Sequence, residues 1–192
     1  MIRAFVAIEM PEDLRHELSE SIAALGRLGA DVRLSRPESV HLTLKFLGDI
    51  EEHQVVPIGK ALSELAGNQA AFRVRIGGLG AFPYLANPRV IWIGVDGGSP
   101  LQVVQGAVEE RLAPLGFPPE KRPFQPHLTL ARVKSRHNVA ALIHYVESHQ
   151  AEAPAGEFVA RQLHLYQSLL RPEGAQYRKL VTADLIQRDG TG

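Results

Sequence analysis

The chain has 192 residues, of which 45% are hydrophobic, and its 21 basic and 21 acidic side chains give a formal net charge of zero. This length suits one substantial domain or two small lobes around a shared core, and the hydrophobic fraction excludes a disordered chain. Proteins that grip long nucleic acids usually carry excess positive charge, so the neutral balance favours a small local contact, such as an RNA terminus or one nucleotide.

The sequence contains no cysteine, which excludes disulfides, thiolate nucleophiles and cysteine metal sites. No apolar run approaches the ~20 residues of a membrane span, and the first residues lack the apolar segment of a signal peptide. We therefore expect a soluble cytoplasmic protein that makes no membrane contact.

Strand-like and helical patterns alternate through the first half of the chain. In order, it is predicted to contain a strand at 3–9, a helix at 12–28, a strand at 40–47, a helix near 54–65 and a strand at 71–76. The first helix is indicated by Leu14, Leu18 and Ile22, which share one helical face.

The second half repeats this alternation. In order, it is predicted to contain a strand at 89–95, a helix that Ser99 caps and Pro100 opens, a strand at 127–133, a short helix capped by Asn138, and strands at 158–167 and 177–186. Segments 77–88 and 114–126 are expected to be loops, and 171–174 a turn between the last two strands. Residues 1–187 are predicted to form one bilobal domain, and 188–192 a disordered tail.

Two copies of one short motif indicate a duplication. The sequence His-Leu-Thr-Leu occurs at 41–44 and again at 127–130, an offset of 86 residues (127 − 41). The same offset relates the Arg-Pro pair at 36–37 to the pair at 122–123, and Arg3 to Arg89. Several matches in one register predict two similar lobes, with an approximate two-fold axis between them.

The period of a β-strand places the histidine and threonine of each motif on one face and the leucines on the other. The first motif strand then presents His41, Thr43 and Lys45, and the second presents His127 and Thr129. If the leucines fill the two lobes, the polar faces meet in a central cleft.

Two opposed histidines suit in-line displacement at phosphorus. The attacking and leaving oxygens lie on opposite sides of the phosphorus, so one side needs a base and the other an acid. Histidine serves either role near neutral pH, and threonine hydroxyls can bind the non-bridging phosphate oxygens. Neither motif has a second histidine or a carboxylate at metal-ligand spacing, so we expect no metal and no cofactor.

The paired motifs resemble those of the two-histidine phosphoesterase superfamily. The segments at 3–8, 41–48 and 127–132 are most similar to its RNA 2′,3′-cyclic phosphodiesterase family (ThpR/LigT), also called 2′-5′ RNA ligase-like proteins. The resemblance runs from Arg3 to about Ile186. It implies an α+β fold in which two antiparallel sheets face a central cleft, with helices on the outside.

The resemblance also implies a reaction and roles for residues. The reaction is metal-independent hydrolysis of an RNA 2′,3′-cyclic phosphate to a 2′-phosphate end, with His41 as the proton donor and His127 as the proton acceptor. Arg132 occupies the place of a family arginine after the second motif. Strict strand parity puts it on the leucine face, so reaching the cleft would require a twist or a bulge.

Further candidates and rival functions remain open at this point. Phe5 and Tyr166 can stack on a base, although core packing is as good an explanation for Phe5. Lys45 can add positive charge near the phosphate. The rival functions are 2′-5′ RNA ligation in the same site, a non-catalytic binder of RNA ends or nucleotides, and a metal-dependent hydrolase. We expect the partner to be a cyclic-phosphate RNA end or nucleotide, and the protein to be a monomer.

Overall fold

A computed structural model describes residues 1–150, 156–171 and 174–187. The helices are α1 (Glu12–Arg27), α2 (Val55–Ala66), α3 (Gly98–Leu112) and α4 (Val139–Ser148), with short 3-10 helices η1 (Pro37–Ser39), η2 (Glu52–Gln54) and η3 (Ala113–Leu115). The strands are β1 (Ile2–Glu9), β2 (Val32–Leu34), β3 (His41–Ile50), β4 (Phe72–Phe82), β5 (Val90–Asp96), β6 (His127–Val133), β7 (Gly156–Ala160), β8 (Gln162–Arg171) and β9 (Gly174–Asp184).

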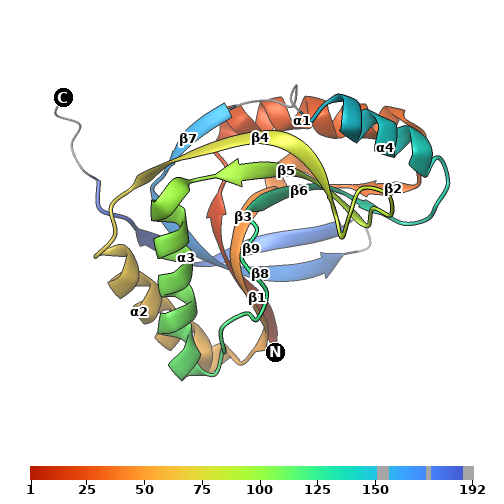
Figure 1. Ribbon diagram of the computed structural model, residues 1–192. Coiled ribbons are helices and arrows are strands. Elements are labelled where there is room, and N and C mark those ends of the chain that lie inside the picture. Colours follow the sequence, from red (N-terminus) through yellow and green to blue (C-terminus); the bar gives the residue numbers. More distant parts are fainter. Residues whose placement is uncertain (151–155, 172–173, 188–192) are drawn as a thin grey trace, which may run out of the picture.

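These strands form two sheets, and their pairings are antiparallel. A four-stranded sheet has the order β3-β1-β8-β9, and a five-stranded sheet has the order β2-β6-β5-β4-β7. Helices α1 and α4 lie together over the five-stranded sheet, and α2 and α3 lie together on the other side of the molecule (Figure 1). The predicted α+β class, with two antiparallel sheets, is confirmed.

The two sheets repeat one arrangement, as the duplicated motifs predict. In the first sheet, the motif strand β3 pairs with β1, which contains Arg3. In the second, the motif strand β6 pairs with β5, which begins directly after the equivalent Arg89. The halves are nevertheless interwoven. Strands β8 and β9, from the end of the chain, complete the first sheet, while β2, from the first half, extends the second. Neither lobe is therefore one continuous stretch of sequence.

One hydrophobic core runs beneath both sheets, and the motif leucines belong to it. Leu42, Leu44, Leu128 and Leu130 are each at most 3% exposed. Their burial fixes which face of each motif strand turns away from the core. The predicted division between leucine and histidine faces is correct as far as the second leucine of each motif.

Some predicted elements differ from the structure. Strand β4 continues through the predicted loop as far as Phe82, because Gly78 adopts a left-handed conformation (φ 75°) at a register shift and keeps the strand paired. The predicted strand 158–167 is two strands that separate at Arg161 and join different sheets. Helix α3 begins at Gly98 after an N-cap at Gly97, so Ser99 is not its cap.

Asn138 stands at the predicted N-cap of α4, but its side chain does not cap the helix. Its amide instead donates to the carbonyl of Leu28 at 3.3 Å. The predicted disordered tail, 188–192, lies outside the described residues.

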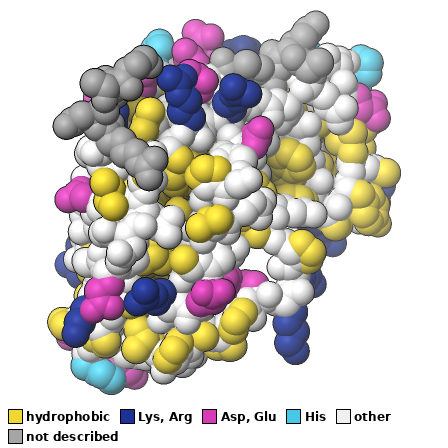
Figure 2. Space-filling model, turned by 60° about the vertical axis from the view of Figure 1, so that its left-hand side comes forward, with side chains coloured by type: hydrophobic (Ala, Val, Ile, Leu, Met, Phe, Trp, Pro, Cys, Tyr) yellow, Lys and Arg dark blue, Asp and Glu magenta, His cyan; other side chains and the backbone are white. Residues whose placement is uncertain are grey.

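Charges of both signs are mixed over the surface shown in Figure 2 and do not gather into one basic patch there. This distribution matches the neutral net charge. Among the described residues, no helix is both long and apolar enough to cross a membrane.

Candidate active site

The first motif strand contains a β-bulge at Leu44. In the pairing of β1 with β3, Ala7 lies opposite Thr43 and Val6 lies opposite Lys45, so Leu44 has no partner of its own. The extra residue shifts the strand by one position, and both Leu44 and Lys45 point into the core.

The second motif strand contains the same bulge at the equivalent residue. Trp92 lies opposite Thr129 and Ile91 lies opposite Ala131, so Leu130 is the extra residue. Leu130 and Ala131 are both fully buried. The duplication therefore extends to the irregularity of the backbone as well as to the motif.

The two bulges decide which later side chains reach the histidine face. Arg132 and its equivalent Phe46 are exposed on that face, whereas Lys45 is only 3% exposed. The prediction that Lys45 shares a face with His41 and Thr43 is wrong, because the bulge reverses the alternation. The Lys45 ammonium pairs with the Glu109 carboxylate and donates to a backbone carbonyl 2.8 Å away.

Both histidines are held in the same way. Nδ1 of His41 lies 2.8 Å from the carbonyl oxygen of Ser39, and Nδ1 of His127 lies 2.7 Å from that of Gln125. A carbonyl oxygen can only accept, so Nδ1 carries the proton in each neutral ring. Each Nε2 is then unprotonated, with no hydrogen-bond partner among the described residues, and can accept a proton.

Thr43 and Thr129 lie two residues after the histidines on the same faces. Neither side-chain hydroxyl has a hydrogen-bond partner within the described part of the chain. Ser35 donates to the backbone carbonyl of Thr129 at 2.8 Å, which ties the segment before the first motif to the second motif strand. Strands β3 and β6 are also in contact, and His41 is close enough to His127 for a charge on His127 to act on it.

Aromatic rings support each histidine. Phe5 stacks on His41 with ring centroids 4.6 Å apart, and Tyr177 meets His41 edge-on at 4.9 Å. In the other lobe, Phe82 meets His127 edge-on at 4.8 Å. Phe5 is only 3% exposed and also stacks on Tyr166, so its ring is part of the packing behind His41 and is not open to a base.

Burial and mutual repulsion lower the histidine pKa values. The pKa of His41 is lowered from 6.5 to about 4, mainly by desolvation and to a smaller extent by the charge on His127, while the hydrogen bond to Ser39 opposes the shift. Desolvation also lowers the pKa of His127, with a smaller contribution from Arg132. Two imidazolium ions are therefore strongly disfavoured together, and both rings are mainly neutral near pH 7 in the free protein.

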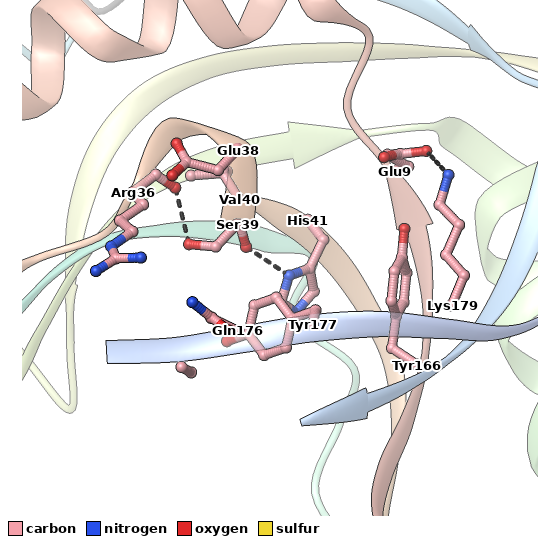
Figure 3. Close-up of a pocket in the computed structure, with 11 residues that line it drawn as sticks. Glu9, Arg36, Glu38, Ser39, Val40, His41, Tyr166, Gln176, Tyr177 and Lys179 are labelled. Carbon is pink, nitrogen blue, oxygen red and sulfur yellow. Dashed lines mark hydrogen bonds and ion pairs between the residues drawn. The ribbon is translucent and has the colours of Figure 1, made fainter. Parts of the chain in front are cut away.

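A cavity of about 370 Å³ opens beside His41. Figure 3 shows His41 beside Ser39 and Tyr177, with Tyr166 and the Glu9–Lys179 ion pair further along the wall. The wall is completed by Arg36, Glu38, Val40, Ala175 and Gln176. His127 does not line this cavity, which therefore lies on the His41 side of the cleft.

Sequence reasoning missed Tyr177 as a neighbour of His41, since its position depends on β9 joining the first sheet. It also missed Phe82 as a neighbour of His127, because residues 77–88 are predicted to be a loop and Phe82 in fact ends strand β4. Within residues 1–150, 156–171 and 174–187, no group of three or more His, Asp or Glu side chains is arranged to hold a metal ion.

Residues 4–171 match the family model of the 2′-5′ RNA ligase superfamily. The chain belongs to this superfamily. The RNA 2′,3′-cyclic phosphodiesterase of Aeropyrum pernix is 36% identical over 164 residues, which cover 85% of this chain and 90% of the relative. That of Archaeoglobus fulgidus is 35% identical over 179 residues, which cover 93% and 98%.

Solved structures agree with membership of the 2′-5′ RNA ligase superfamily. The protein TT0787 of Thermus thermophilus has a TM-score of 0.76 at 30% identity, covering 96% of this chain and 98% of that chain. Escherichia coli LigT complexed with 3′-AMP has a TM-score of 0.73 at 26% identity, covering 97% of this chain and 99% of that chain. The resemblance inferred from the paired motifs is thereby confirmed.

Proposed function

We propose that this protein hydrolyses the 2′,3′-cyclic phosphate at an RNA end to a 2′-phosphomonoester by acid–base catalysis between His41 and His127, without a metal. The matched geometry of the two rings carries this proposal. Each Nδ1 is engaged by the carbonyl two residues earlier, which leaves two equivalent Nε2 atoms for the substrate. The relatives named RNA 2′,3′-cyclic phosphodiesterase support the choice of substrate.

In the proposed reaction, a water molecule attacks phosphorus and loses a proton to Nε2 of His127. The bond from phosphorus to the 3′ oxygen breaks, and Nε2–H of His41 gives its proton to that oxygen. The phosphate stays on the 2′ oxygen. One proton is taken up and one is released, so the pair finishes with its proton on the opposite ring and returns to the starting state by exchange with solvent.

The division of roles between the two rings follows the family resemblance, because burial lowers the pKa of both. The charge on Arg132 further disfavours an imidazolium at His127, which keeps that ring unprotonated before water attacks. His41 is neutral in the free protein at pH 7, since burial lowers its pKa to about 4. A bound phosphate anion favours the charged ring, so substrate binding itself would load His41 with the proton that it donates.

The remaining candidates divide between binding and support. Thr43 and Thr129 are placed to donate to the non-bridging phosphate oxygens, because their hydroxyls have no other partner among the described residues. The cavity beside His41 suits the nucleoside that carries the cyclic phosphate, with Tyr166 in its wall. Phe5 supports the His41 ring, and Lys45 has no part in substrate binding, since its ammonium is buried against Glu109.

The superfamily description makes 2′-5′ ligation a second candidate reaction. It is the reverse step, in which an RNA hydroxyl replaces water as the nucleophile. Water at ~55 M competes with that hydroxyl, so hydrolysis should dominate unless a second RNA end is held in place. The assignment of residues 1–187 to one catalytic unit, the monomeric state and the cytoplasmic location stay predictions.

The test is turnover of a panel of 2′,3′-cyclic nucleotides and RNA ends in the presence of a chelator, with identification of the oxygen that keeps the phosphate. His41→Ala and His127→Ala should each lower kcat by about 10²–10⁴-fold. His144→Ala, on the exposed surface of α4, is the matched control and should keep wild-type turnover.

Near-normal turnover in either catalytic variant would contradict the two-histidine mechanism. A 3′-phosphate product would contradict the proposed bond cleavage. Loss of activity with the chelator would point instead to a metal.

A further inference from the structure

Two arginines face each other at the edge of the five-stranded sheet. In the pairing of β2 with β6, Arg33 lies directly opposite Arg132. Directly opposed residues of an antiparallel pair share a face and have Cβ atoms roughly 5 Å apart, so two like charges there destabilise the pair. Both side chains are exposed, and neither has a carboxylate partner within the part of the chain that the structure describes.

This arginine pair (Arg33 and Arg132) lies on the cleft face. The bulge at Leu130 turns Arg132 to the face that carries His127 and Thr129, and Arg33 follows it through the register. Across the cleft, both guanidinium groups are close enough to Tyr177 to oppose the rise that burial causes in the pKa of its hydroxyl.

The spacing along β6 separates the arginine pair from the reacting phosphate. Thr129 and Arg132 lie opposite Trp92 and Val90, which are two strand steps apart, or roughly 7 Å. Successive phosphates along an RNA strand are separated by a comparable distance. A terminal cyclic phosphate held by the threonines would therefore bring the preceding phosphodiester to the arginine pair.

We propose that Arg33 and Arg132 form a subsite for the phosphodiester that joins the terminal nucleotide to the one before it, so that the protein prefers RNA ends to free cyclic nucleotides. Guanidinium groups are the side chains best matched to phosphate, because their planar fork donates two hydrogen bonds at once. Two guanidinium groups set against each other, with no carboxylate partner among the described residues, form a site whose charge a bound anion would balance. This inference rests on the proposed function, since that function places the cyclic phosphate between the histidines.

The experiment compares three substrates that end in the same cyclic nucleotide and carry a 5′ hydroxyl. One is the 2′,3′-cyclic mononucleotide, the second is the dinucleotide, and the third is the dinucleotide with a neutral methylphosphonate in place of the internucleotide phosphate. Wild-type kcat/KM should be highest for the charged dinucleotide. The methylphosphonate keeps its length and bases, so a loss there reports the charge alone.

In Arg33→Gln, the loss of kcat/KM on the charged dinucleotide should exceed the loss on the mononucleotide by about tenfold or more, the expected value of a charge-assisted hydrogen bond. Arg33→Lys should recover part of it. With a longer RNA, Arg33→Gln should lower the slope of log binding constant against log salt by about 0.7. Arg27→Gln, an exposed arginine in the last turn of α1, is the control and should not change the substrate ratio.

Equal losses of kcat/KM on the mononucleotide and the dinucleotide in Arg33→Gln would leave the substrate ratio unchanged and would overturn the subsite. Arg33 would then act on the reacting phosphate or on the fold. If the wild-type protein hydrolyses none of the three substrates, the proposed function fails instead, so the two failures are distinguishable.

Discussion

Replacement of Lys45 by methionine should destabilise the protein by about 3 kcal/mol, the lower end of the range for breaking a buried ion pair. The side chains of Lys45 and Glu109 are 2% and 11% exposed. Without the ammonium, the Glu109 carboxylate stays buried with two weaker donors, Gln105 Nε2 at 3.1 Å and the Glu120 backbone N–H at 3.3 Å. Because these two donors still stabilise the carboxylate, the loss of stability should not reach the upper end of the range for a broken buried ion pair.

The same reasoning predicts that removing both charges is far milder. In Lys45→Met/Glu109→Met, no charge is left unpaired, and Gln105 still has the Leu44 carbonyl within 3.5 Å. The double variant should therefore lie within about 1 kcal/mol of the wild type, because apolar replacements of buried pairs are often neutral or stabilising.

Urea unfolding followed by circular dichroism measures these differences in the free energy of unfolding. In thermal unfolding, Lys45→Met should lose about 6–12 °C in Tm. The matched control is Lys60→Met, which breaks an exposed pair with Glu64 whose charged groups are 3.9 Å apart. Its cost should be no more than about 0.5 kcal/mol. The reasoning is refuted if Lys45→Met costs no more than Lys60→Met. It is also refuted if the cost of the double variant equals the sum of the costs of Lys45→Met and Glu109→Met measured singly.

Four further predictions concern the histidines and their aromatic neighbours. The pH profile of kcat/KM should be bell-shaped and centred on the acid side of pH 6.5, because the pKa values of both His41 and His127 are lowered in the free protein. Since unfolding restores those pKa values, the unfolded chain binds more protons below pH 6.5, so the free energy of unfolding should fall as the pH drops towards 4, with a shallower slope in His41→Gln. Phe5→Leu should keep the fold but lower kcat about tenfold, since the ring stacked on His41 is lost; unchanged kcat would remove Phe5 from that supporting role. Tyr177→Phe keeps the edge-on ring and should stay within about twofold of wild-type kcat, whereas Tyr177→Ala should not.

The part of the site that sequence could predict is the part that strand parity governs. His41 and Thr43 lie on one face with Leu42 on the other, and the second motif repeats this. Beyond the second leucine, a bulge reverses the alternation of faces in both strands. The extra residue leaves no mark in the hydrophobic pattern, so the sequence does not predict the bulge. Parity therefore puts Lys45 on the wrong face, while the bulge that Arg132 needs is present.

Other features cannot be read from the sequence because they depend on distant strands. The segment Val32–Leu34 is too short to show a period, so the pattern predicts neither β2 nor a role for Arg33. The two explanations of Phe5 separate only once β1 is seen between β3 and β8, where its ring is covered by His41 and Tyr166.

The interwoven lobes also bear on how the protein is made. The first sheet holds His41, yet its outer strand β9 comes after all the other described strands in the sequence. That strand supplies Tyr177 and Lys179 to the wall of the cavity beside His41. During synthesis, both histidine motifs can therefore be exposed before the strand that completes the cavity wall is available. Pairings between segments so far apart in the sequence form slowly. The cavity beside His41 should therefore form only after β9 has been synthesised and has paired with β8.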